Sequence, residues 1–357
     1  MKNMHFFLGA NSAEGFYSLY DQLLDAELYD LLILKGGPGC GKSTFMRRAA
    51  AAMEARGQQA VYIHCSGDPD SLDGVIFPEL GTALVDGTSP HVLEPRCMAA
   101  RERYVDLSPY YDVAAAKARR EELIALTDRY RASYRDAYHV LRALGGVDAE
   151  RRAAVRPGFD ERKLLRRAEG IAGRELRGKN GKTGRCVHVF LGGMTCKGCL
   201  CRFDTVDSLC PRVYELCDSY GLGQPALRLL RRAAVDAGLD VIVCRDPDRP
   251  EEMQHLLIPS RGLAFVTTNE SCRREERSYR RLRIDAMAEE GLTHAQKAHL
   301  RFIRRIRRVL AEEAVSALAC AKREHDALEE LYRPCVDFEG VGALCEAEIA
   351  RIESRVP

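Results

Sequence analysis

Nine consecutive residues, Gly36-Gly37-Pro38-Gly39-Cys40-Gly41-Lys42-Ser43-Thr44, match the G-x-x-x-x-G-K-[ST] pattern of a phosphate-binding loop. An apolar run at residues 31–34 precedes them, and a helix-forming stretch at residues 45–53 follows. Glycines let the backbone wrap closely around a phosphate, and the start of a helix adds N–H groups at the same point. Lys42 would contact the β- and γ-phosphates, while the Ser43 hydroxyl would ligate Mg²⁺. The motif in this context predicts that the chain binds a nucleoside triphosphate.

Asp86 is the candidate for the acid that completes the Mg²⁺ shell. It directly follows an apolar run at residues 82–85, and an acid at the end of a buried strand can bind the ion directly or through water. The alternative is that Asp86 only caps a turn, because Asp-Gly is common turn chemistry. The residue that orients an attacking water is not evident, since no glutamate follows Asp86. The residues near the expected carboxyl-end rim are Asp68, Asp70, Asp73, Glu79 and His91.

The second half of the chain repeats the first in order. His5-Phe6-Phe7-Leu8-Gly9 recurs as His188-Val189-Phe190-Leu191-Gly192, and residues 74–78 and 81–85 recur as residues 255–259 and 262–266. Such ordered matches indicate a duplicated α/β unit. Short apolar runs alternate with helices in each unit, which predicts a largely parallel sheet flanked by helices. Apolar residues at helical spacing over residues 112–150 and 280–322 predict long helices.

We therefore expect an α/β fold with duplicated sheets of the P-loop NTPase type, each with an appended helical arm. The expected units are residues 1–111 and 184–271, and the expected arms are residues 112–183 and 272–357. If the duplication is real, the residues before Arg185 should fold alone and bind nucleotide.

The second copy has lost the groups that bind phosphate. Aligning the halves places Gln224 opposite Lys42 and Pro225 opposite Ser43, and Thr267 stands opposite Asp86. Proline removes both the magnesium hydroxyl and a backbone N–H donor. The second half is therefore predicted to be a degenerate pseudo-site with a structural or regulatory role. The joint loss of the lysine and the acid favours Asp86 as a metal ligand.

Composition is that of an ordinary globular protein. The chain has 357 residues, 46% hydrophobic and 30% charged, with a net charge of +2. This charge gives no whole-chain attraction to nucleic acid or to an anionic membrane. It favours solvated helix faces for the basic stretches at residues 151–185 and 301–308; the alternative is that their arginines hold phosphate backbones or act as an arginine finger. No apolar run approaches the roughly 20 residues of a membrane helix, and the N-terminus does not resemble a signal peptide. The expected compartment is the cytoplasm.

Fourteen cysteines are many for such a chain. Disulfides are not expected in a reducing compartment, which leaves thiols or metal ligation. The tightest group, Cys196, Cys199 and Cys201, could hold zinc or an iron–sulfur centre. No second C-x-x-C closes the set, however, and the other cysteines are scattered as small core residues would be.

The chain resembles a family of bacterial tandem P-loop ATPase-like proteins. The resemblance rests on His5-Phe6-Phe7-Leu8-Gly9, on the loop with its preceding strand, and on the tracts at residues 64–73, 78–80 and 86–91. It covers nearly the whole chain, to Tyr332-Arg333-Pro334 and Asp337-Phe338-Glu339. The resemblance implies two fused P-loop units, usually with a phosphate loop in both, and this chain departs from that pattern at Gln224 and Pro225.

The sequence thus predicts an ATP-binding protein, with Mg²⁺ as cofactor, that hydrolyses ATP slowly in its first half. The helical arms would transmit the nucleotide state and could contact a protein partner. One alternative is a phosphotransferase acting on a small metabolite or nucleotide, with Arg96, Arg101 and Arg103 as a phosphate clamp. Another is a non-catalytic scaffold that ATP stabilises. The base is adenine by default only, and the oligomeric state is not specified.

Overall fold

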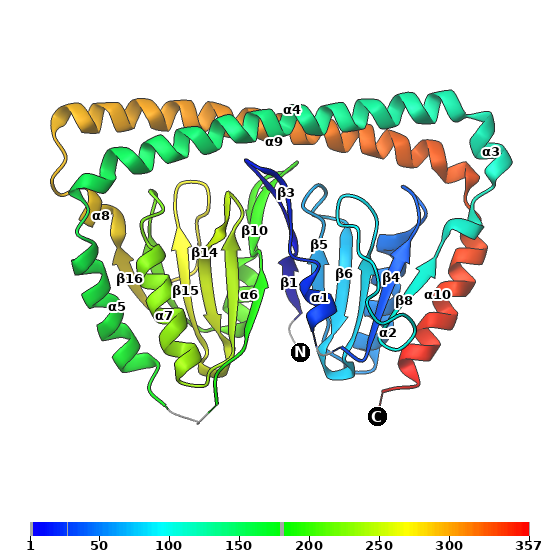
Figure 1. Ribbon diagram of the computed structural model, residues 1–357, viewed down its shortest axis with the longest axis horizontal. Helices are drawn as coiled ribbons and strands as arrows, with labels where there is room; N and C mark the ends of the chain where they lie inside the picture. Colours follow the sequence, from blue (N-terminus) through cyan, green and yellow to red (C-terminus); the bar gives the residue numbers. More distant parts are fainter. Residues whose placement is uncertain (1–2, 27, 179–181, 357) are drawn as a thin grey trace.

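The computed structural model describes residues 3–26, 28–178 and 182–356. It consists of two six-stranded sheets placed side by side beneath a pair of long antiparallel helices (Figure 1). The same succession of elements builds both sheets, which confirms the α/β class expected from the sequence.

Over residues 3–26 and 28–118, the first half contains eight strands and three α-helices. Its elements are β1 (Met4–Phe7), β2 (Gly9–Ser12), β3 (Gly15–Ser18), α1 (Gln22–Asp25), β4 (Asp30–Lys35), α2 (Lys42–Ala55), β5 (Val61–His64), β6 (Leu72–Phe77), η1 (Pro78–Leu80), β7 (Thr82–Asp86), β8 (Glu102–Asp106), η2 (Ser108–Tyr110) and α3 (Val113–Ala118). The strands of its sheet lie in the order β1-β5-β6-β7-β4-β8. The β2–β3 pair forms a separate hairpin.

The second half repeats this arrangement. Its elements are β9 (Cys186–Val189), β10 (Gly192–Thr195), β11 (Gly198–Cys201), α6 (Phe203–Leu209), β12 (Arg212–Cys217), α7 (Gln224–Asp236), β13 (Val241–Asp246), β14 (Arg249–Ile258), η4 (Pro259–Arg261), β15 (Leu263–Thr268), β16 (Arg280–Arg283) and α8 (Ile284–Glu289). The sheet order, β9-β13-β14-β15-β12-β16, matches that of the first half strand for strand.

The sheets are mixed: five of the six strands in each run in the same direction, as expected for a largely parallel sheet, and one strand runs against them. β6 runs antiparallel to both β5 and β7, and β14 runs antiparallel to both β13 and β15. The reason is the short connection from β6 to β7, where only η1 and Gly81 intervene. A parallel crossover needs a dozen residues or more, whereas a tight turn returns the chain in the opposite direction.

The two halves meet around one shared core. Phe7 and Phe190 exchange backbone hydrogen bonds of 2.9 and 2.8 Å across the junction. Buried apolar residues of both sheets, among them Phe6, Ile63, Leu191 and Val266, form a single cluster there. The halves are therefore packed against each other through apolar side chains.

The arms cross between the halves. After the first half come α4 (Arg120–Val155), η3 (Arg156–Gly158) and α5 (Glu161–Glu175), and after the second half come α9 (His294–Tyr332), η5 (Arg333–Cys335) and α10 (Phe338–Glu353). α4 leads α5 to the second half, where it packs on α7, and α9 leads α10 back to the first half, where it packs on α2 (Figure 1). Each sheet is thus covered by the arm that follows the other unit.

Apolar residues explain these contacts. Leu141 and Leu144 of α4 pack against Ala314 and Leu318 of α9. Val341, Cys345 and Ile352 of α10 are buried in the cluster that contains Phe45 and Met46 of α2.

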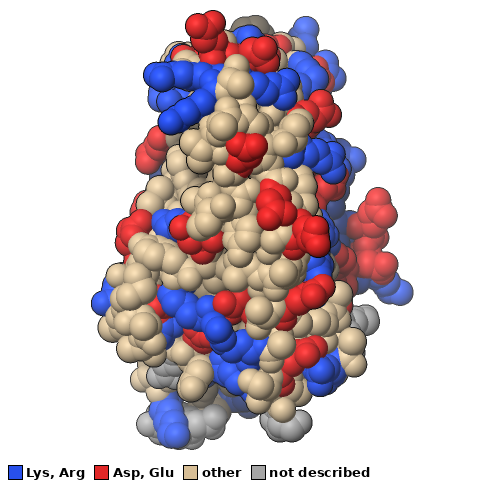
Figure 2. All heavy atoms as spheres, turned by 90° about the vertical axis from the view of Figure 1, so that its right-hand side faces the viewer, with Lys and Arg blue, Asp and Glu red and all other residues tan. Residues whose placement is uncertain are grey.

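Charges on the α10 side are mixed in sign. The face that lies at the right of Figure 1 carries interspersed basic and acidic side chains (Figure 2). Arg48 of α2 pairs with Glu346 of α10 at 3.0 Å, and Arg56, which follows the last residue of α2, pairs with Glu353 at 2.8 Å. No helix in the described part of the chain combines the length and the apolar character needed to cross a bilayer.

Candidate nucleotide site

The phosphate-loop motif lies between a buried strand and a helix, as its spacing predicts. Leu31 to Leu34 of β4 are fully buried, and α2 begins at Lys42. Gly39 and Gly41 have φ angles of 71° and 89°, a region that side chains rarely adopt. A Cβ on Gly39 would lie 2.9 Å from the backbone oxygen of Glu329, so α9 abuts the loop. The glycines therefore serve both the turn and the close approach of a helix that begins in the second half.

Lys42 folds back over the loop. Its ammonium donates to the carbonyl oxygens of Gly36 and Gly37 at 2.8 and 3.0 Å. The same nitrogen lies 3.5 Å from Oδ2 of Asp86, and both side chains are largely buried. The structure thus brings the predicted phosphate-contacting lysine and the predicted acid together.

Ser43 and Asp86 supply the oxygen atoms of the predicted Mg²⁺ site. The Ser43 hydroxyl oxygen accepts a hydrogen bond of 2.9 Å from the N–H of Leu72. Oδ1 of Asp86 accepts from the N–H and the hydroxyl of Thr88 at 2.9 and 2.6 Å. Asp86 therefore does cap a turn, as the alternative interpretation expects, while its other oxygen faces Lys42. Hydroxyl and carboxylate oxygens are donors of the kind that Mg²⁺ prefers.

A buried acid–histidine pair lies beside these groups. Oδ2 of Asp73 is 3.3 Å from Nε2 of His91 and accepts a hydrogen bond of 3.0 Å from the Tyr20 hydroxyl. Burial opposes protonation of His91, but the Asp73 carboxylate outweighs it and raises the pKa of His91. Burial likewise opposes ionisation of Asp73, yet His91 and Tyr20 lower its pKa. Both shifts describe a buried ion pair.

This pair connects to the candidate ligands through the backbone. Asp73 directly follows Leu72, whose N–H donates to the Ser43 hydroxyl oxygen. The N–H of His91 donates to the carbonyl of Thr88, and the hydroxyl of Thr88 donates in turn to Asp86. Asp73 and His91 were only two of several rim candidates in the sequence. Their pairing is a property of the fold, because 18 positions separate them in the chain.

Other candidates lie elsewhere. Glu79 is exposed in η1, which follows the antiparallel strand β6 and so lies at the opposite edge of the sheet from Asp73. Asp68 pairs with Lys322 at 3.3 Å, and Asp70 pairs with Lys197. These acids tie the rim to α9 and to the second half.

The proposed arginine clamp does not form at the loop. Arg103 pairs with Glu348 of α10 and with Asp30 at the start of β4, the end far from the phosphate loop. Arg101 binds Glu102, and Arg96 binds Asp25 of α1. All three arginines therefore stabilise contacts between elements of the first half or with α10.

The second loop has the same length and place as the first. Six residues separate β12 from α7, as six separate β4 from α2, so Gln224 corresponds to Lys42. The Gln224 side chain binds both the N–H and the carbonyl of Met253 in β14. Pro225 lies in the first turn of α7. Gln224 thus joins the helix to the sheet at the position where the first half presents a cation.

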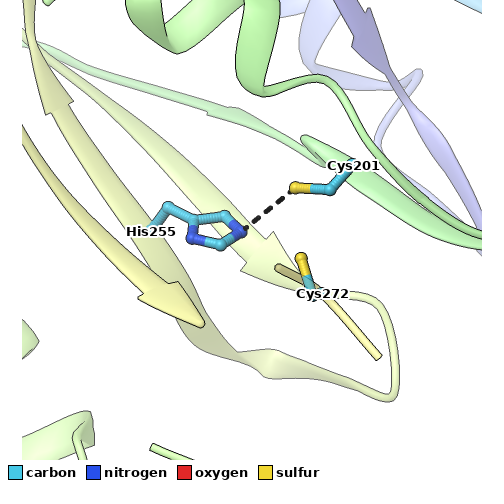
Figure 3. Close-up of side chains that lie close together, drawn as sticks. All are labelled: Cys201, His255 and Cys272. Atoms are coloured by element: carbon cyan, nitrogen blue, oxygen red, sulfur yellow. Dashed lines mark hydrogen bonds between the residues drawn. The ribbon is translucent and has the colours of Figure 1, made fainter. Parts of the chain in front are cut away.

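Cys196, Cys199 and Cys201 do not form a group of metal-ligating atoms among the described residues. Cys201 instead lies near Cys272 and the buried His255, with which it shares one small cluster (Figure 3). Cys272 lies about 70 positions downstream of Cys201, so no local pattern of residues indicates this group. A second group of metal-binding residue types, His325, Asp326 and Glu329, lies on one turn of α9, where Asp326 pairs with Lys322.

The histidine of the cysteine cluster carries its proton on the nitrogen that a metal would need. Nδ1 of His255 accepts a hydrogen bond of 3.0 Å from the N–H of Thr267, so the proton of the neutral ring is on Nε2. Nε2 is the atom that faces Cys201, at 3.9 Å. Burial lowers the pKa of His255 to about 3, which keeps the ring neutral. The group is thus a hydrogen-bonded core contact.

Comparison with known proteins adds no relative. No family model, no curated protein and no solved structure matches the chain. The fold and the site define a duplicated α/β protein with one loop of the phosphate-binding pattern and one altered copy.

Proposed function

We propose that the chain binds ATP in its first half and hydrolyses it slowly, as a tandem P-loop protein with one working site. The observation that carries the proposal is the position of Lys42. Its ammonium lies over the loop at the start of α2 and within 3.5 Å of Asp86. A point charge, a helix N-terminus and a carboxylate at one place are the parts that phosphoryl chemistry needs.

Each group then has a role. The loop N–H groups and Lys42 would hold the β- and γ-phosphates, and Ser43 and Asp86 would hold Mg²⁺, which neutralises charge on the phosphate oxygens. Water attacks the γ-phosphorus, and the bond to the bridging oxygen breaks to give ADP and phosphate. Asp73 and His91 would fix the segment that carries Asp86, as positioning residues. The backbone N–H of His91 donates to the carbonyl of Thr88 in this segment, and Asp73 pairs with His91, which supports that role.

The arms support a readout of the nucleotide state. α9 touches the loop at Gly39 and extends from the second half, and Lys322 of the same helix pairs with Asp68 of the rim. A loop ordered by a γ-phosphate could therefore shift a helix that reaches the other sheet. The phosphotransferase alternative is weakened because Arg96, Arg101 and Arg103 are engaged elsewhere.

The test is Mg²⁺-dependent phosphate release from ATP and GTP by the intact chain, by Lys42→Ala and by the matched variant Gln224→Ala. We expect Lys42→Ala to lower turnover about a hundredfold or more, since it removes a charge from the transferring phosphate. Gln224→Ala should leave turnover unchanged. Equal turnover in all three forms would contradict the proposed site, and nucleotide binding without turnover would favour the scaffold.

A further inference from the structure

The backbone of the second loop is bound by carboxylates of the chain itself. Oδ1 of Asp218 accepts a hydrogen bond of 2.9 Å from the N–H of Leu222, and Oδ2 accepts one of 2.6 Å from the N–H of Gly223. Asp285 accepts from the N–H and the hydroxyl of Ser219 at 2.7 and 2.8 Å. Three loop N–H groups at the start of a helix thus point at negatively charged oxygens, as they would at a phosphate.

Asp218 places a buried carboxyl group in this position: burial raises its pKa, and the loop N–H groups and the charge of Arg249 oppose that shift. Only 4% of the residue is exposed, and its carboxylate accepts from the two loop N–H groups and lies near the charge of Arg249. The guanidinium of Arg249 lies against the loop, since a Cβ on Gly221 would be 2.5 Å from it. Two N–H donors and one cation therefore surround the carboxylate, although Gln224 has replaced the loop lysine.

The first loop differs at the corresponding position. Counting from the strand ends at Lys35 and Cys217, Asp218 corresponds to Gly36. The carboxylate is therefore an addition to the second copy, in the place where the first copy has no side chain.

A cavity lies beside the carboxylate of Asp218 and the second loop. It measures about 440 Å³, and its lining includes Asp218, Gly221 and Arg249 together with Arg151 and Arg152 of α4. The charge of the lining is mixed, because Arg151 pairs with Asp148 and Glu270, and Arg249 pairs with Asp246 and Glu252.

We propose that the second loop is an anion-binding nest whose occupant is the carboxylate of Asp218, and that inorganic phosphate enters the same nest when this carboxylate is removed. The second half then holds a closed loop without nucleotide. The proposal does not depend on ATP hydrolysis in the first half.

The test uses the full chain with Lys42→Ala, which disables the first loop, and adds Asp218→Gly, the residue that stands at position 36. Thermal unfolding is followed in increasing phosphate, with chloride at matched ionic strength. We expect Asp218→Gly to lower the Tm by roughly 5 °C in chloride and phosphate to restore most of the loss, while the Lys42→Ala parent does not respond. Equal responses of parent and variant, or none in either, would overturn the proposal.

Asp218→Asn is the matched control. Its side chain still fills the nest but turns an amide N–H₂ toward one loop N–H, so the Tm should fall and phosphate should not restore it. Restoration of Asp218→Asn to the same extent as Asp218→Gly would contradict a specific nest. If Asp218→Gly is unfolded in chloride, refolding of this variant in phosphate supports the proposal. If Asp218→Asn is folded but Asp218→Gly does not refold in phosphate, the proposal is contradicted.

Discussion

The two loops differ in the sign of the charge that the chain brings to them. The first brings a cation, Lys42, which is held by two loop carbonyls and lies near Asp86. The second brings an anion, Asp218, which is held by two loop N–H groups, while Gln224 binds a neighbouring strand. A loop of this geometry requires partners for its backbone groups. The comparison teaches that the second copy keeps the geometry by supplying from its own side chains what a ligand would supply.

Removal of α10 should have the largest effect, and it should destabilise the first half but not the second. A chain that ends at Asp337 uncovers α2, and the lost burial of Val341, Cys345 and Ile352 costs on the order of 5 kcal/mol. Because domains are stable by only about 5–15 kcal/mol, the first half should unfold. The second half keeps its cover, α5. Hydrogen exchange of α2 and α7 measures the difference.

The matched control for this truncation is Glu346→Ala, an exposed α10 residue paired with Arg48. It should change stability by less than about 1 kcal/mol. Unchanged protection of α2 in the truncated chain would show that the crossing of the arms is not needed for stability. It would also restore the expectation that the residues before Arg185 fold alone.

The next effect is on turnover. Asp86→Asn should lower ATP hydrolysis about 10- to 1000-fold, because an amide is a poor ligand for Mg²⁺ and removes the charge beside Lys42. Thr267→Val changes the corresponding residue of the second half and should leave turnover within about twofold. Steady-state phosphate release compares the two. A larger loss in Thr267→Val would reverse the assignment of the working half.

A smaller effect concerns the pH dependence of stability. His91→Gln breaks a buried pair and should lower the free energy of unfolding by about 3 kcal/mol near pH 6. The folded pKa of His91 is raised above 6.5, so its contribution is full below pH 6.5 and is lost as the pH rises through the folded value. The folded pKa of Asp73 is lowered below 3.8, so its contribution is full above that pH and is lost on acidification.

The difference between wild type and His91→Gln should therefore be largest from about pH 4 to 6.5 and should shrink toward pH 9. Urea denaturation across this range measures it. Gln254 corresponds to Asp73 in the second half, and Gln254→Ala should show no such dependence. A difference that is constant from pH 5 to 9 would contradict the ion pair.

The smallest effect is expected from zinc. Because Nε2 of His255 carries its proton toward Cys201, equimolar Zn²⁺ should shift the Tm of the reduced protein by no more than about 1 °C. Cys201→Ser should respond in the same way. A shift of several degrees that is lost in Cys201→Ser would show that the ring reorients to bind metal.

Local patterns in the sequence were enough to predict the loop, the flanking strand and helix, and the long arms. The glycine spacing fixes a turn, and the correspondence of Gln224 to Lys42 follows from the repeat. The direction of β6 was missed, although the three residues of η1 are too few for a parallel crossover. The short connection between β6 and β7 is the feature of the sequence that indicates an antiparallel β6.

Other features depend on contacts between distant segments. The Asp73–His91 pair, the Cys201–His255–Cys272 cluster and the crossing of α5 and α10 all join residues that no local pattern connects. Asp218 was overlooked for another reason. A pattern of retained phosphate ligands does not include a carboxylate that takes the place of the phosphate.

The crossing of the arms also has a consequence for the evolution of the chain. Cys345 of α10 bonds to the backbone of Phe45, 300 positions earlier, so the first sheet gains its cover only after the second half has been synthesised. A mutant gene that lost its second half would leave α2 uncovered and the first half unstable. Selection for the first loop would therefore preserve the second copy even though that copy has lost its lysine.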